Sequence, residues 1–87
     1  MLAVSAAPPL VLLALADARS IAPPSLVARL RATGATVYVT HGSAGCLRVA
    51  VALEPRVILL EPGLPDRLVG LLRAHPRSAH ALISELA

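Results

Sequence analysis

The chain has 87 residues, enough for one small domain and too few for two, because domains rarely form below roughly 50 residues. Hydrophobic residues make up 56% of the sequence and charged residues 15%, a balance that excludes an intrinsically disordered chain. The net charge of +3 comes from eight arginines spread along the sequence, and Tyr38 is the only aromatic residue. Nucleic-acid binders usually carry a concentrated basic stripe with stacking aromatic side chains. We therefore expect a single domain over residues 1–87 that binds no nucleic acid.

The first half of the chain alternates between strand-like and helix-like segments. Residues 10–16 form a continuous apolar run, which is typical of a strand buried on both faces. Pro23 and Pro24 suit the start of a helix, whose apolar residues recur at helical spacing until Gly34 ends it. Residues 35–40 are rich in β-branched side chains and predict a second strand.

The second half repeats this alternation. Ser43 is a fair N-cap for a helix over residues 44–53. The apolar run 57–60 predicts a strand in the middle of a parallel sheet, and an apolar stripe over residues 68–74 predicts a third helix. The last apolar segment, residues 79–83, is expected to form a fourth short strand.

This order of elements predicts an α/β fold with a parallel sheet and helices on both of its faces. The expected strand order is two, one, three, four, which leaves the fourth strand as an open edge with apolar surface beside it. Functional residues of such sheets gather at the carboxyl ends of the strands. Here these positions are Asp17, His41, Gly42, Glu61 and Ser84.

The segment from Pro55 to Glu61 has four apolar residues after Arg56, and Leu64 and Pro65 follow shortly after Glu61. This pattern resembles the receiver domain of bacterial response regulators, which reads Pro-Asp, four apolar residues, Asp, and then Leu-Pro or Met-Pro. The resemblance covers roughly residues 10–84, since Gly34 to Val37 also falls where receivers have Gly-x-x-Val, and Gly42 to Cys46 where they have Gly-x-x-Ala-Leu. It implies a flavodoxin-like fold truncated to four strands.

The departures from the receiver pattern concern the phosphate chemistry. Glu61 stands at the phosphoacceptor position, where receivers have Asp, and Asp17 remains from an acidic pair whose other member is Ala18 here. The chain has no lysine and stops before the strand that carries the receiver lysine, while Ser84 corresponds to the receiver's hydroxyl switch. These losses predict no catalysis, no metal ion and no cofactor.

The leading hypothesis is a degenerate receiver-like module of two-component signal transduction, cytoplasmic and not phosphorylated, that acts through protein–protein contact. Its partner is expected to be another protein or a second copy, with the fourth-strand edge as the contact and no membrane involved. Glu61 is then either a stand-in for phospho-aspartate or a solvated carboxylate at a strand end. One alternative is a working phosphoacceptor receiver that a partner completes. Another is a secreted protein cleaved at the small-residue site Ala16-Asp17-Ala18.

The histidines and the cysteine have simpler interpretations. His41, His75 and His80 are not spaced as a metal-ligand set and are expected at the surface. Cys46 lies on the apolar side of its helix, which indicates a core residue, and a single cysteine excludes an internal disulfide. The glycine-bearing turn from His41 to Gly45 leads into a helix N-terminus and is a weak anion-site signal.

Overall fold

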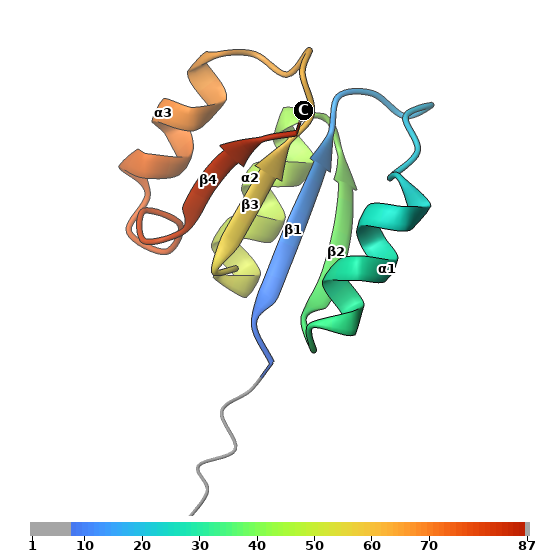
Figure 1. Ribbon diagram of the computed structural model, residues 1–87. Coiled ribbons are helices and arrows are strands. Elements are labelled where there is room, and N and C mark those ends of the chain that lie inside the picture. Colours follow the sequence, from blue (N-terminus) through green and yellow to red (C-terminus); the bar gives the residue numbers. More distant parts are fainter. Residues whose placement is uncertain (1–7, 87) are drawn as a thin grey trace, which may run out of the picture.

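The computed structural model of the protein describes residues 8–86, in which strands and helices alternate (Figure 1). The first seven residues and Ala87 of the expected domain lie outside the described part. In chain order the elements are β1 Leu10–Leu15, α1 Pro24–Ala32, β2 Thr36–His41, α2 Gly42–Leu53, β3 Val57–Leu60, α3 Arg67–Ala74 and β4 Leu82–Glu85.

The strands form one sheet in the order β2-β1-β3-β4, and every neighbouring pair is parallel. This is the flavodoxin-like topology, and it confirms the predicted α/β fold and strand order. β1 lies in the centre, where Leu13 is registered with Val39 of β2 and with Leu59 of β3. All of its residues after Leu10 are buried, as the continuous apolar run predicted.

The helices cover the two faces of the sheet unequally. α2 and α3 pack on one face, where Leu68 and Leu72 of α3 join Cys46 and Ala50 of α2 in the main core cluster. α1 lies on the opposite face beside β2 (Figure 1), and none of its residues is buried. The sheet contributes to the core cluster through Leu12, Ala14, Ile58 and Leu60.

The start of α1 agrees with the prediction from the sequence, and the start of α2 does not. α1 begins at Pro24, and Gly34 follows its end with a φ of +91°, which glycine adopts at little cost. α2 begins directly at Gly42 with His41 as N-cap and has no side-chain cap hydrogen bond. The predicted N-cap at Ser43 is therefore wrong, because the helix starts as soon as β2 ends and places Ser43 in its first turn.

The fourth strand begins later than residues 79–83 suggested. The chain turns after α3, where the backbone N–H groups of Ser78 and Ala79 both donate to the carbonyl oxygen of His75. The hydroxyl of Ser78, which is buried, donates to the carbonyl oxygen of Leu72 at 2.5 Å. These bonds hold residues 76–80 in turns, so β4 covers Leu82–Glu85 instead.

Two observations bear on membranes and processing. No helix within residues 8–86 combines the length and the apolar composition that crossing a membrane requires. Cleavage after Ala18 would remove β1, the strand that pairs with both β2 and β3.

Candidate functional site

The carboxyl ends of β1 and β3 meet through the side chain of Glu61. Its Oε1 accepts a hydrogen bond from the backbone N–H of Ala16 at 2.7 Å, and its own N–H donates to the carbonyl oxygen of Ala14 at 2.9 Å. Glu61 is partly buried. The sheet therefore brings Glu61 to the residue directly before Asp17, at the edge where the sequence placed both carboxylates.

The carboxylate of Asp17 is used within its own turn. Its Oδ1 accepts the backbone N–H of Arg19 at 2.7 Å, and its backbone carbonyl accepts the N–H of Ser20 at 3.1 Å. This is an Asx turn, a common local role for an exposed aspartate. His41 closes the edge on the β2 side, where its Nε2 lies 3.1 Å from the carbonyl oxygen of Ser20.

Both carboxylates at this edge already accept hydrogen bonds from backbone N–H groups. Mg²⁺ takes six oxygen ligands in octahedral geometry and relies on carboxylates to hold it. Within residues 8–86, no three His, Cys, Asp or Glu side chains are grouped so that they can hold a metal ion. Asp17 and Glu61 are therefore best described as carboxylates that each accept one backbone N–H group and stabilise the local backbone.

Ser84 does not lie at the end of its strand. It is exposed within β4 and registered with Leu59, one position before the end of β3. The backbone N–H of Leu86 bonds to the carbonyl oxygen of Leu60, so Leu86 rather than Ser84 lies beside Glu61. The late start of β4 explains this difference from the expected register.

Leu64 and Pro65 form the turn between β3 and α3, as their sequence position predicted. Leu64 is partly buried and packs against the core cluster. Pro65 is exposed, and its carbonyl oxygen accepts the N–H of Leu68 at 3.0 Å. The pair therefore connects the carboxyl edge to α3 by packing and by backbone bonding.

A buried hydroxyl near this edge, on Thr40, has no signal in the sequence. Oγ1 of Thr40 is buried and has no hydrogen-bond partner among the described residues. The side chain lies under the first turn of α2, where a β-carbon built on Gly45 would lie 3.8 Å from that of Thr40. The β-branched character of Thr40 predicted its strand, but nothing in the sequence signalled an unpaired hydroxyl.

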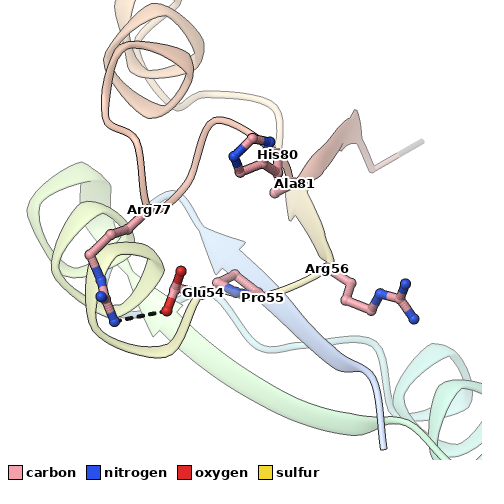
Figure 2. Close-up of a pocket in the computed structure, with 6 residues that line it drawn as sticks. All are labelled: Glu54, Pro55, Arg56, Arg77, His80 and Ala81. Carbon is pink, nitrogen blue, oxygen red and sulfur yellow. Dashed lines mark ion pairs between the residues drawn. The ribbon is translucent and has the colours of Figure 1, made fainter. Parts of the chain in front are cut away.

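A hollow of about 280 Å³ lies at the opposite edge of the sheet, at the amino end of β3 (Figure 2). Arg77 crosses one side of it. Its Nη2 lies 2.9 Å from Oε2 of Glu54, and its Nε donates to the carbonyl oxygen of Val51 at 2.6 Å. The lining residues are Glu54, Pro55, Arg56, Arg77, His80 and Ala81.

The charges around this hollow do not converge on its centre. Arg77 is paired with Glu54, whereas the side chain of Arg56 points away from that pair (Figure 2). At this hollow, Arg77 therefore connects the turn after α3 to the end of α2. No sequence signal could have found it, because residues 54 and 77 meet only through the fold.

Cys46 lies on the side of α2 that faces the sheet and is fully buried in the core cluster. Burial raises the pKa of its thiol from 9.0 to about 11, because an apolar environment disfavours the charged thiolate. The thiolate is the nucleophilic form of cysteine. The sequence interpretation of Cys46 as a core residue therefore agrees with its position.

Comparison of the chain with protein families, with curated proteins and with solved structures gives no match.

Proposed function

We propose that the protein is a degenerate receiver-like module of bacterial signal transduction, which carries no phosphate on Glu61 and acts by binding another protein in the cytoplasm. The observation that carries this proposal is the 2.7 Å hydrogen bond from the backbone N–H of Ala16 to Oε1 of Glu61. At the position that resembles a phosphoacceptor, the carboxylate serves as a structural link between β1 and β3.

The remaining charges at the edge support the same conclusion. Phosphoryl transfer depends on positioning the phosphoryl group and on neutralising its charge with cations. The chain contains no lysine, Ala18 replaces the second acidic residue of the receiver pattern, and Asp17 is bonded to its own turn. A phosphoryl group on Glu61 would therefore gain little compensating charge and would displace the bond to Ala16.

Protein contact is favoured by the apolar surface that the fold leaves exposed. Leu82 of the edge strand β4 is 67% exposed, although its pairing partner Val57 is partly buried. Apolar side chains clustered beside an open sheet edge are typical of interaction surfaces. The proposed activity is therefore binding, with the fold presenting a fixed surface.

The test is to add Mg²⁺ with beryllofluoride, and separately a small phosphodonor, to the purified protein. The amide NMR spectrum should stay unchanged around Glu61, and the intact mass should show no added phosphoryl group. Glu61→Asp is the matched control, since it restores the phosphoacceptor residue type without the missing lysine, and it should also stay unmodified. Saturable shifts around Glu61 or a phosphoryl adduct on the wild-type chain would instead favour a working receiver.

A further inference from the structure

The face of the sheet that α1 occupies is apolar from the centre to the edge at β4, with one interruption at the exposed Ser84. Paired residues of parallel strands present their side chains on the same face, and Val11 of β1, Val57 of β3 and Leu82 of β4 form one such row. The next row consists of Leu13, Leu59 and Ser84. We call the apolar residues in the outer part of this face, Val57, Leu59, Leu82 and Leu86, the β3–β4 strip; Ser84 separates Leu82 from Leu86 in it.

The side chains on this face become more exposed from β1 towards β4. Val11 is 5% exposed, Val57 is partly buried and Leu82 is 67% exposed. α1 is the only described helix on this side and lies beside β2, so no helix among residues 8–86 covers β3 and β4 on the side where α1 lies (Figure 1). On the other face, by contrast, α2 and α3 bury Ile58 completely.

The uncovered width accommodates one further helix. Neighbouring strands lie about 4.8 Å apart, so β3 and β4 lie about one and two such steps from β1. Packed helices lie about 8–10 Å apart, which is about two strand steps, so a helix next to α1 would lie over β3 and border β4. A groove of about 320 Å³ lies between the first half of α1 and the Leu86 end of the strip, lined by Pro23, Ser25, Leu26, Arg29 and Leu86.

Two arginines beside the strip favour a helix with acidic side chains. Arg29 lines the groove from α1, and Arg56 directly precedes Val57 at the amino end of the strip. Both arginines are exposed, and neither has a carboxylate partner among residues 8–86. Glu61, at the other end, is bonded to the backbone of Ala16. A helix that carries glutamate or aspartate beside its apolar stripe would therefore complement the two arginines.

A helix from a second copy of the chain fits the strip poorly. None of α1, α2 and α3 contains an acidic residue, and each contains at least one arginine. A helix from another copy would thus place like charge against Arg29, and like charges held together are unfavourable.

We propose that the β3–β4 strip is the docking site for one acidic amphipathic helix of a different protein. The helix lies beside α1, its apolar stripe covers Leu59 and Leu82, and its carboxylates pair with Arg29 and Arg56. This inference rests on the proposed contact function and names the class of partner.

The experiment uses three synthetic helical peptides of about 18 residues, long enough to form helix in water. All three share one leucine stripe, and their flanks carry glutamate, glutamine or lysine. The peptide with glutamate flanks should bind most tightly and should shift the amide NMR signals of β3, β4 and α1. Leu82→Ser and Arg29→Glu should each weaken its binding about tenfold, and Arg29→Glu should improve binding of the lysine peptide.

Leu71→Ser and Arg73→Glu are matched controls on α3, because both side chains are exposed on the other side of the sheet. They should leave binding unchanged. The proposal is overturned if no peptide shifts the strip at about 1 mM, if the lysine peptide binds best, or if the shifts map to α2 and α3. A concentration-dependent dimer that Leu82→Ser abolishes would also overturn it, in favour of self-association.

The two proposals fail separately. If the protein binds neither beryllofluoride nor any of the three peptides, the proposed function stands and the acidic-helix partner is ruled out. A chain that accepts a phosphoryl group and still binds the glutamate peptide at the strip loses the phosphate-free role and keeps the docking site.

Discussion

Gly63 approaches Ala16 so closely that a β-carbon on Gly63 would lie 3.3 Å from the β-carbon of Ala16. Its φ of +107° also lies in a region that side chains with a β-carbon rarely adopt. The turn after β3 is thus fitted to the end of β1 at two neighbouring points, here and at the bond between Glu61 and Ala16.

Gly63→Ala should destabilise the protein by about 1–3 kcal/mol, because it combines backbone strain with a tight contact. Gly70→Ala is the matched control, since Gly70 lies inside α3 and its added methyl group meets open space. It should stabilise the protein by about 0.5–1 kcal/mol through the higher helix propensity of alanine. Chemical denaturation of both variants measures the difference, and equal effects would contradict the fitted turn.

Removing the Glu61 side chain should weaken the join between β1 and β3. Glu61→Ala leaves the N–H of Ala16 without its partner and should lower the free energy of unfolding by about 1 kcal/mol. Glu61→Gln keeps an oxygen acceptor on a side chain of the same length, so its effect should be smaller. The measurement is the urea midpoint of each variant, and an Ala variant as stable as the wild type would show that the bond contributes nothing.

The two serines that follow α3 should respond differently to substitution. Ser78→Ala removes a buried hydroxyl that bonds to the carbonyl of Leu72 near the end of α3, and should cost about 1–3 kcal/mol. Ser84 is exposed, and Ser84→Ala should change stability by less than about 0.5 kcal/mol. A large effect at Ser84 in thermal unfolding would indicate a bond that this register does not provide.

Cys46 should make stability depend on pH in the alkaline range. The unfolded chain loses the thiol proton near the ordinary pKa of 9.0, whereas the folded chain retains it to about 11. Between these values the folded state binds more protons, so the free energy of unfolding should fall as the pH rises. Cys46→Ala should lack this part of the slope. Maleimide labelling should likewise be slow at neutral pH and accelerate when denaturant exposes the thiol.

The fold could be predicted from sequence because its signals are local. The run 57–60 and the first strand are apolar on both faces, and Pro24 and Gly34 mark the limits of α1. The sequence predicts the last strand too early, because the start of β4 depends on the turn that Ser78 forms through bonds to Leu72 and His75. No periodicity in residues 79–83 reports those bonds.

The candidate site was predictable as a location but not as a set of contacts. Strand order alone brings Asp17 and Glu61 to one edge. The bond from Ala16 to Glu61, the ion pair of Glu54 with Arg77 and the buried hydroxyl of Thr40 depend on side-chain geometry between distant segments. Such contacts leave no spacing in the sequence that residue types alone could reveal.

The central place of β1 has a consequence for synthesis of the chain on the ribosome. Its pairing partners β2 and β3 end at His41 and Leu60, so β1 is translated well before either neighbour is available. Throughout that interval the apolar residues Leu10–Leu15 have no sheet to join. Until β2 leaves the exit tunnel, the nascent chain therefore carries an unpaired apolar segment that is prone to aggregation.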